Sequence, residues 1–324
     1  MRDWGESLRQ WLPEGTVRFD RPLREDTTFR IGGCARLSVG VHAKDHLIEV
    51  VHQAIREGFP WFLLGGGSNV LFSARGFDGV VILNRLDDLR LTSQDRIETG
   101  AGLPLIDFVR FAEKNGLSGA EDLAGIPGSV GGAIVGNAGA FGRNIGEILE
   151  YVDLISEDGT VSRMVPDDLE FDYRESKLKY SQDVVISAGF KLTQGNPPLI
   201  EKRIEEILAL RAGKHPAKGV ATAGSFFKNL PPEKPGDRRV AAGLILDRAG
   251  AIGLSVGDAA VFEKHANIVV NRGAATAKEV LELTAIMKRI AFESAGVALE
   301  EEVRRIGFTE DELAATEIVR AGNR

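Results

Sequence analysis

A lone hydroxyl in the segment 219–230 has the surroundings of a reaction centre. Ser225 follows Gly224 and precedes two phenylalanines, Lys228 and Asn229. This order places a proton donor between a flexible glycine and a group of apolar, cationic and amide side chains, as a positioned acid requires. We therefore predict that Ser225 takes part in proton transfer.

Two isolated charged motifs could complete this centre. Arg174 lies in the polar run 172–176. A guanidinium binds a carboxylate in two-point geometry, so Arg174 could bind a substrate carboxylate or form a surface salt bridge with Glu175. Glu302 ends a run of three glutamates on an expected strand, where alternation places it on the same face as Glu300. The triplet could equally be solvated surface.

A glycine run upstream is typical of an anion-binding loop. An expected short strand over residues 62–64 leads directly into Gly65-Gly66-Gly67-Ser68-Asn69. Glycines accept positive φ angles, which turn successive backbone N–H groups toward one side, so the loop could surround a phosphate. A tight strand connection is the alternative. A dinucleotide fingerprint would need glycine at Val70, and the Gly-Lys-Ser/Thr of a Walker loop is absent.

A second glycine-rich segment covers residues 119–142 and contains eight glycines. Aliphatic residues such as Ile126 and Ile134 are interleaved with them, so the segment is not a flexible linker. Glycines between buried aliphatics indicate a backbone pressed against something flat or bulky. A ring-bearing cofactor fits that pattern better than a simple turn. Neither glycine segment contains His or Cys, so no side chain that commonly tethers a flavin is present in them.

Two other motifs are weaker. Gly253-Leu-Ser255-Val-Gly257 matches a nucleophile elbow, but the elbow requires a strand before it and a helix after it, and the reverse is expected here. His42 and His46 lie four residues apart in an expected helix, yet the zincin glutamate and a third ligand are missing. We therefore expect neither a serine hydrolase nor a metal site.

Composition narrows the class of protein. The chain has 324 residues, 43% hydrophobic and 27% charged, which predicts two or three domains. A net charge of -7 argues against binding nucleic acid or an anionic membrane. Locally, residues 202–239 carry nine Lys and Arg against four acidic residues. This excess favours an anionic small molecule, with a solvated basic surface as the alternative.

The single cysteine, Cys34, excludes an internal disulfide framework and a thiolate metal cluster. The charged N-terminus lacks an apolar signal region, and no apolar stretch approaches the length of a membrane span. We expect a soluble cytoplasmic protein.

Both helices and strands are expected to position these residues. Helical patterns cover residues 1–18, 42–58, 103–115, 166–171, 199–212, 240–248, 276–295 and the chain from 309 onward. Strand patterns cover the residues around Gly32-Gly33 and the ranges 62–64, 80–83, 96–99, 149–156, 160–165, 183–192, 267–271 and 297–306. Asp158-Gly159 predicts a hairpin turn, Thr276 with Glu279 a capping box, and residues 195–198 a domain boundary.

Taken together, these residues resemble a known family. The matching segments are TTFRIGG, LLGGGSNVLF, GAEDLAGIPGSVGGAIVGNAGAFG, YRES, RAGK, AGSFFKN, EKHANIVVN and EEVRRIG. They extend over about residues 27–307 and closely resemble the UDP-N-acetylenolpyruvoylglucosamine reductase (MurB) family, flavoenzymes of peptidoglycan precursor synthesis.

The resemblance implies an α+β protein. A two-subdomain FAD-binding fold of the vanillyl-alcohol-oxidase (PCMH) type would precede an α+β substrate-binding domain. The implied ranges are 1–19 for an N-terminal helical segment, 20–197 for the FAD-binding domain (subdomains about 20–86 and 87–197) and 198–324 for the substrate domain.

The resemblance also implies an activity and its residues. The enzyme would reduce the enolpyruvyl ether UDP-N-acetyl-3-O-(1-carboxyvinyl)-glucosamine to UDP-N-acetylmuramate with NADPH through noncovalent FAD, serving cell wall biogenesis, cell shape and cell division. A monomer is favoured. The implied catalytic residues are Arg174, Ser225 and Glu302, the substrate-binding residues are Lys214, Asn229 and Arg211, and the FAD-binding residues are Gly65, Gly66, Gly67, Ser68, Asn69, Ile126, Gly128, Gly131, Gly132, Asn137 and Gly139.

One departure concerns the substrate domain. Some family members carry an insertion after the YRxS motif, with a tyrosine that covers the uridine. Here only residues 177–210 separate Ser176 from Arg211, which indicates the subtype without that insertion. An oxygen-using flavin oxidase with the same cofactor fold and a noncatalytic nucleotide-sugar sensor remain alternative functions.

Overall fold

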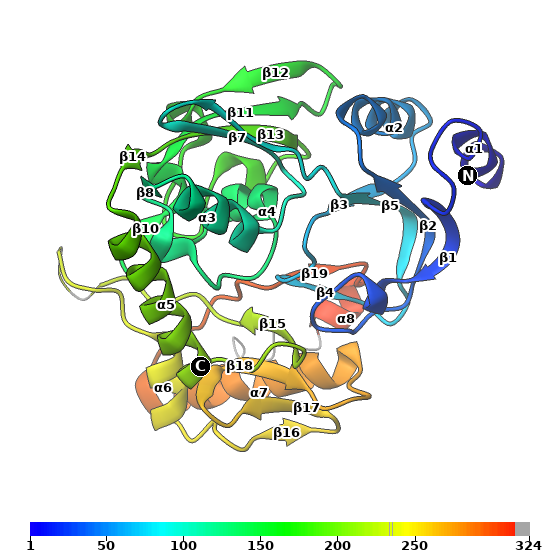
Figure 1. Ribbon diagram of the computed structural model, residues 1–324. Coiled ribbons are helices and arrows are strands. Elements are labelled where there is room, and N and C mark those ends of the chain that lie inside the picture. The colour runs from blue at the N-terminus through cyan, green and yellow to red at the C-terminus, as the bar shows by residue number, and fades with distance from the viewer. Residues whose placement is uncertain (233, 235, 315–324) are drawn as a thin grey trace. The chain divides into compact units, whose positions relative to one another are not determined.

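A computed structural model describes residues 1–232, 234 and 236–314 (Figure 1). The chain forms two compact units. The N-terminal unit contains Met1–Arg21, Arg36–Gly66 and Gly79–Arg211. The C-terminal unit contains Pro22–Ala35, Gly67–Asp78 and Ala212–Arg324, so two early segments belong with the end of the chain.

The N-terminal unit begins with a four-stranded sheet of order β1-β2-β5-β3. Its strands are β1 (Val17–Pro22), β2 (Cys34–Val41), β5 (Phe77–Asn84) and β3 (Trp61–Leu64), and its helices are α1 (Arg2–Leu8) and α2 (Lys44–Arg56). Helix α2 confirms the helix expected within residues 42–58, and its apolar face is buried through Leu47, Val50, Val51 and Ala54. The helix expected within residues 1–18, ended by Pro13 and Gly15, stops earlier than predicted, at Leu8, and residues from Val17 onward form strand β1.

A five-stranded sheet of order β12-β11-β13-β7-β6 completes this unit. Its strands are β6 (Leu89–Ser93), β7 (Arg96–Gly100), β11 (Leu149–Ile155), β12 (Val161–Met164) and β13 (Val184–Lys191). Strands β11 and β12 pair antiparallel, as the Asp158-Gly159 turn predicted. The helices are α3 (Leu105–Lys114), α4 (Val130–Val135) and α5 (Pro197–Lys214). Phe108 of α3 lies against Phe190 of β13, with ring centroids 4.5 Å apart.

Short elements connect these parts. The two-stranded pairs are β8 (Leu117–Ser118) with β14 (Thr193–Gln194) and β9 (Gly139–Ala140) with β10 (Arg143–Asn144). The 3-10 turns are η1 (Leu23–Glu25), η2 (Glu121–Leu123), η3 (Ile145–Glu147), η4 (Pro166–Leu169) and η5 (Lys177–Lys179).

The C-terminal unit is built on an antiparallel sheet of order β15-β18-β17-β16, with α7 packed on one face (Figure 1). Its strands are β15 (Ala221–Ser225), β16 (Ser255–Val256), β17 (Ala259–Phe262) and β18 (His265–Asn271), and its helices are α6 (Ala242–Arg248), α7 (Ala277–Ala295) and α8 (Glu310–Ala314). The predicted capping box is confirmed, since the Thr276 hydroxyl accepts from the Glu279 N–H and the Glu279 carboxylate from the Thr276 N–H. Strand β4 (Val70–Phe72) pairs in parallel with β19 (Arg304–Ile306).

Two further segments differ from what the sequence patterns indicated. The strand expected over residues 297–306 is a strand only from Arg304, because residues 300–302 make a single isolated bridge, Phe227 with Glu301. The segment 119–142 contains helix α4, begun by the Ser129 hydroxyl, which accepts a hydrogen bond of 3.3 Å from the Gly132 N–H. The end of the expected C-terminal helix lies outside the described residues.

Candidate active site

Ser225 lies at a β-bulge. In the antiparallel pair of β15 and β18, Thr222 pairs with Val270 and Ser225 with Ile268, so two residues of β15 oppose one residue of β18. Gly224 has φ of +78°, a value that side-chain-bearing residues rarely adopt. A bulge changes the direction in which the next side chain points, so the glycine before Ser225 sets the orientation of its hydroxyl.

The residues after Ser225 are held from both sides. The buried Asn267 of β18 accepts at its side-chain oxygen from the Phe227 N–H (2.9 Å) and donates to the Phe227 carbonyl (2.8 Å). On the other side, the Lys228 N–H donates to the Glu300 carbonyl and the Glu302 N–H donates to the Phe226 carbonyl, each at 2.8 Å. The backbone of the residue next to Ser225 is thus bonded directly to Glu302, and these two predicted catalytic residues lie in one hydrogen-bonded arrangement.

Asn69 connects the first glycine loop to Glu302. Its side-chain amide donates a hydrogen bond of 3.0 Å to the Glu302 carbonyl, and its carbonyl accepts one of 3.0 Å from the Arg304 N–H. The strands that follow, β4 and β19, then pair in parallel. The end of the glycine loop therefore fixes the backbone that carries Glu302.

The three adjacent glutamates have different surroundings. The Glu300 carboxylate accepts from the Lys228 ammonium at 2.5 Å. The Glu301 carboxylate, 13% exposed, is paired with Lys288 of α7 at 2.5 Å and with Arg305. Sequence reasoning missed this ion cluster, because its two cations come from separate elements. Glu301 anchors the segment that carries Glu302.

The two glycine-rich segments meet within the N-terminal unit. A Cβ added to Gly66 would lie 2.7 Å from the Gly128 Cα, and one added to Gly65 would lie 2.3 Å from the Ser129 Oγ. Any side chain at either position would collide with the other segment. The glycines are thus required by a close backbone contact between loops that are 62 positions apart, as expected for two walls of one site.

Within the second segment, some predicted flavin contacts are tied to the protein itself. Cβ atoms on Gly131 and Gly139 would lie 2.8 Å from the Ala101 Cβ and 2.2 Å from the Arg143 carbonyl oxygen. Asn137 is buried with φ of +40°, and its amide oxygen accepts from the Gly146 N–H at 3.3 Å. These contacts explain the residue types without a ligand, so their contact with flavin stays a prediction.

Arg174 sits in a strained turn. Its φ is +58°, and the turn is closed by reciprocal backbone hydrogen bonds between Asp172 and Glu175. The Arg174 Nη2 donates to the Gly139 carbonyl at 2.8 Å, and Lys179 Nζ donates to the Arg174 carbonyl at 3.0 Å. A left-handed conformation at a non-glycine residue is unfavourable and persists only where surrounding contacts enforce it. The surrounding hydrogen bonds therefore hold Arg174 in a backbone conformation that it would otherwise rarely adopt.

The Glu175 carboxylate accepts hydrogen bonds from Lys179 Nζ at 3.0 Å and from the Tyr180 hydroxyl at 2.5 Å. The Ser176 hydroxyl donates to the Val135 carbonyl at 2.7 Å. Glu175 and Ser176 therefore brace the turn around Arg174. Lys179, which supports both Arg174 and Glu175, was missed because it lies outside the YRES motif.

The predicted substrate-binding residues lie at the end of α5 and around α6. Arg211 Nε donates to the Gly125 carbonyl at 2.9 Å, and burial, together with the charge of Arg174, lowers the pKa of its guanidinium. Because Arg211 is partly buried and lies near the like charge of Arg174, a bound anion would stabilise both guanidinium groups. Lys214 is exposed, and the Asn229 amide oxygen accepts from the Ala242 N–H at the start of α6, at 3.2 Å.

The weaker motifs gain no support. Ser255 is an exposed residue of the β16–β17 hairpin, without the strand-to-helix turn of a nucleophile elbow. His42 precedes α2, so the expectation that it shares a helix with His46 is wrong.

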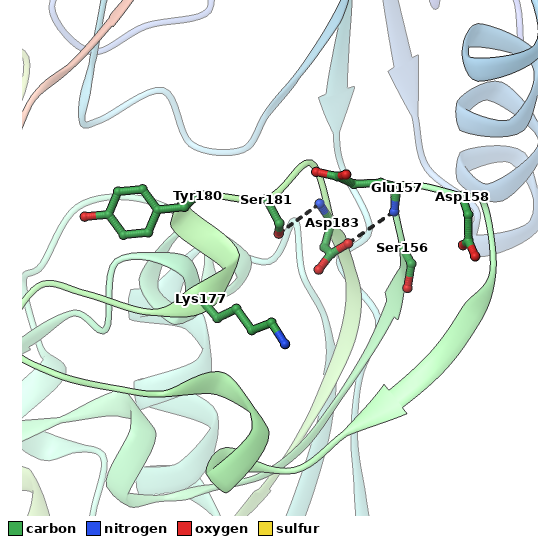
Figure 2. A pocket seen from close by; sticks show the side chains of 7 residues that line it. All are labelled: Ser156, Glu157, Asp158, Lys177, Tyr180, Ser181 and Asp183. Atoms are coloured by element: carbon green, nitrogen blue, oxygen red, sulfur yellow. Dashed lines mark hydrogen bonds between the residues drawn. The ribbon is translucent and has the colours of Figure 1, made fainter.

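An open pocket in the N-terminal unit is lined by Ser156, Glu157, Asp158, Lys177, Tyr180, Ser181 and Asp183 (Figure 2). None of these is a predicted site residue. No described helix is both long and apolar enough to cross a membrane.

Comparison with known proteins defines the class of this fold and site. Residues 35–164 match the model of an FAD binding domain. Residues 215–306 match the model of the UDP-N-acetylenolpyruvoylglucosamine reductase C-terminal domain. The protein is thus a flavoprotein with an FAD-binding domain followed by a second α+β domain, and the predicted fold class is confirmed.

Whole-chain relatives specify the family. UDP-N-acetylenolpyruvoylglucosamine reductase of Heliobacterium modesticaldum is 36% identical over 92% of this chain and 91% of its own. That of Pelobacter propionicus is 40% identical over 90% and 96%. The crystal structure of the Thermus caldophilus enzyme superposes with a TM-score of 0.74 at 34% identity, covering 89% of this chain and 99% of its own. The chain belongs to the UDP-N-acetylenolpyruvoylglucosamine reductase family, as predicted.

The residues present fit an FAD. The contact between Gly66 and Gly128 leaves backbone, rather than side chains, at the loops expected to approach the cofactor. The buried Thr27 hydroxyl has no hydrogen-bond partner among the described residues, and the Thr27 backbone lies against Gly67. A buried donor without a partner, on a residue whose backbone contacts a glycine loop, suits a phosphate-bearing ligand.

Proposed function

We propose that the protein reduces the enolpyruvyl ether of UDP-N-acetyl-3-O-(1-carboxyvinyl)-glucosamine to UDP-N-acetylmuramate with NADPH, through noncovalently bound FAD. This reaction belongs to peptidoglycan precursor synthesis, and we place it in the cytoplasm of the cell. The observation that supports it best is the backbone hydrogen bond between Glu302 and Phe226, which joins two segments that match the family's catalytic motifs.

We assign FAD to the two glycine-rich segments. Gly65, Gly66, Gly67, Ser68 and Asn69 would hold its pyrophosphate, and the flavin would be lined by Ile126, Gly128, Gly131, Gly132, Asn137 and Gly139. When bound, FAD supplies the hydride transfer that no amino-acid side chain can perform. The protein residues bind and orient the reactants and move the proton.

The proposed catalytic residues have separate tasks. Arg174 is a permanent cation, so it binds the substrate carboxylate and stabilises the negative charge that spreads into it during reduction. Glu302 would act on the same enolate-like charge by donating a hydrogen bond from a protonated carboxyl group. Ser225 then protonates the carbanionic carbon. An alcohol is a weak acid, but such a carbon is basic enough to take its proton if the hydroxyl is well placed.

The remaining assignments concern binding. Lys214, Asn229 and Arg211 would bind the nucleotide-sugar substrate, where cationic side chains favour its diphosphate. We also keep the domain division 1–19, 20–197 and 198–324, and a monomeric enzyme, as proposals.

Product analysis tests this function. The purified enzyme, NADPH and the enolpyruvyl sugar should yield a product with two more hydrogens than the substrate, measured by mass spectrometry, and one NADPH consumed per product. A flavin oxidase would instead consume oxygen without the reduced sugar. A noncatalytic sensor would bind the sugar and leave NADPH unchanged.

A further inference from the structure

Thr27 carries a buried hydroxyl without a partner. Its side-chain oxygen is inaccessible to solvent, and the residue is only 7% exposed. No described residue accepts or donates a hydrogen bond at this oxygen. The next residue provides a contrast, since the Thr28 hydroxyl donates to the Thr222 carbonyl at 2.7 Å. Two adjacent threonines of one motif therefore differ in whether the protein itself uses their hydroxyls.

The backbone around Thr27 lies directly against the first glycine loop. The Thr28 N–H donates to the Gly67 carbonyl at 3.0 Å. A Cβ added to Gly67 would lie 2.2 Å from the Asp26 carbonyl oxygen and 2.9 Å from the Thr27 Cα. Gly67 also has φ of +62°, so a side chain there is disfavoured on two grounds. The absence of a side chain at Gly67 is what admits the threonine segment.

A buried hydroxyl that lacks a partner destabilises the folded chain, and native proteins rarely keep one unless a ligand or bound water uses it. The neighbour of Thr27 here is a loop whose glycines suit an anion. A hydroxyl can donate to a phosphate oxygen, and hydrogen bonds to charged acceptors are among the stronger ones in proteins.

We propose that the Thr27 hydroxyl donates a hydrogen bond to a phosphate oxygen of FAD. This inference rests on the proposed function, in which the Gly65 to Asn69 loop holds the pyrophosphate. It adds a side-chain donor to a loop whose assigned role depended on backbone groups. It also explains why Thr27 is a threonine in the protein interior, where valine has the same shape and no unpaired oxygen.

The test compares Thr27→Val, which removes only the hydroxyl, with Thr27→Ser, which keeps it. Each full-length holoenzyme is diluted to equilibrium, and released FAD is measured by its fluorescence to give a Kd. We expect Thr27→Val to raise the Kd by at least about tenfold, as for a lost hydrogen bond to a charged group. Thr27→Ser should stay within about threefold of the wild type.

The melting temperature of the full-length chain stripped of FAD is the second measurement. Thr27→Val should melt at or above the wild-type temperature, since no partner inside the protein is lost. The control Thr28→Val loses the bond to Thr222, so it should melt lower, by roughly 2 °C or more.

Three results would overturn the inference. The first is a Thr27→Val variant with the same Kd for FAD as the wild type. The second is a Thr27→Val variant whose FAD-free chain melts at as low a temperature as Thr28→Val. The third is a Thr27→Ser variant whose Kd for FAD rises as much as that of Thr27→Val. A wild-type protein that binds no FAD would overturn the proposed function as well. Normal FAD binding by both the wild type and Thr27→Val would overturn this inference alone.

Discussion

The side-chain amide of Asn137 donates a hydrogen bond of 2.8 Å to the backbone carbonyl of Asp172. This bond joins the second glycine-rich segment to the turn that presents Arg174. The bonds from Ser176 to the Val135 carbonyl and from Arg174 to the Gly139 carbonyl reinforce the same connection. The segment predicted to line the flavin and the predicted substrate-binding guanidinium are therefore joined by three hydrogen bonds, with φ values of +40° at Asn137 and +58° at Arg174.

Lys179 should act as a positioning residue for Arg174. Lys179→Met removes the hydrogen bonds that Lys179 Nζ donates to the Arg174 carbonyl and to the Glu175 carboxylate. The strained turn should then relax, and kcat should fall by about tenfold, since small displacements of reacting groups are costly. Lys179→Arg should restore part of kcat. The matched control Lys177→Met, at an exposed position of the same 3-10 turn, should behave as the wild type. A Lys179→Met enzyme with lower thermal stability but normal kcat would contradict this role.

Ser225 should be needed for the step after flavin reduction. Ser225→Ala should lower turnover of the enolpyruvyl sugar by about 10²-fold or more, the usual effect of losing a positioned proton donor. Bleaching of the flavin by NADPH, followed by stopped-flow absorbance, should remain. Ser255→Ala provides the same substitution at an exposed position and should leave turnover unchanged. Equal turnover by the Ser225→Ala and wild-type enzymes would remove Ser225 from the mechanism.

Glu301 should stabilise the C-terminal unit. Glu301→Gln leaves the Lys288 and Arg305 side chains, 23% and 13% exposed, without their shared carboxylate. Removing one partner of a largely buried ion cluster costs about 3 kcal/mol. Denaturant unfolding followed by circular dichroism should show the loss. Glu282→Gln, at an exposed pair with Lys278, should change stability by less than about 0.5 kcal/mol. Equal effects of the two substitutions would show that the cluster contributes nothing.

His265 should make stability depend on pH. Burial lowers the pKa of its imidazole below the usual value, and the charge of Lys214 lowers it further. The unfolded chain therefore takes up a proton first as the pH falls, so stability is retained above about pH 6.5 and lost below it, as the pH falls toward the folded-state pKa. His265→Asn keeps an acceptor for the Asn267 N–H and should flatten this loss of stability below about pH 6.5. The exposed control His42→Asn should keep the wild-type slope, measured by thermal unfolding.

Local sequence signals predicted the elements that depend on neighbouring residues. Helix α2, the capping box of α7 and the hairpin at Asp158-Gly159 follow from spacing and turn chemistry alone. The sequence patterns did not indicate strand β1, and they placed the start of strand β19 too early. Pairing with distant strands decides where these two strands begin and end.

The site divides in the same way. Ser225, Arg174 and Glu302 could be selected from their motifs, whereas the bulge at Gly224 exists only through pairing with β18. The roles proposed for Glu301 and Lys179 depend on partners that spacing in the sequence does not reveal. The role proposed for Thr27 depends on its hydroxyl having no hydrogen-bond partner among the described residues. A useful signal was available for Thr27, since it stands in the TTFRIGG segment that the family resemblance includes.

The most direct test follows the flavin spectrum of the purified protein without oxygen. NADPH should bleach the oxidised flavin absorbance, and the enolpyruvyl ether of UDP-N-acetylglucosamine should restore it while UDP-N-acetylmuramate forms. A protein that carries no flavin, or whose reduced flavin is reoxidised by oxygen but not by the enolpyruvyl sugar, would contradict the proposed reaction.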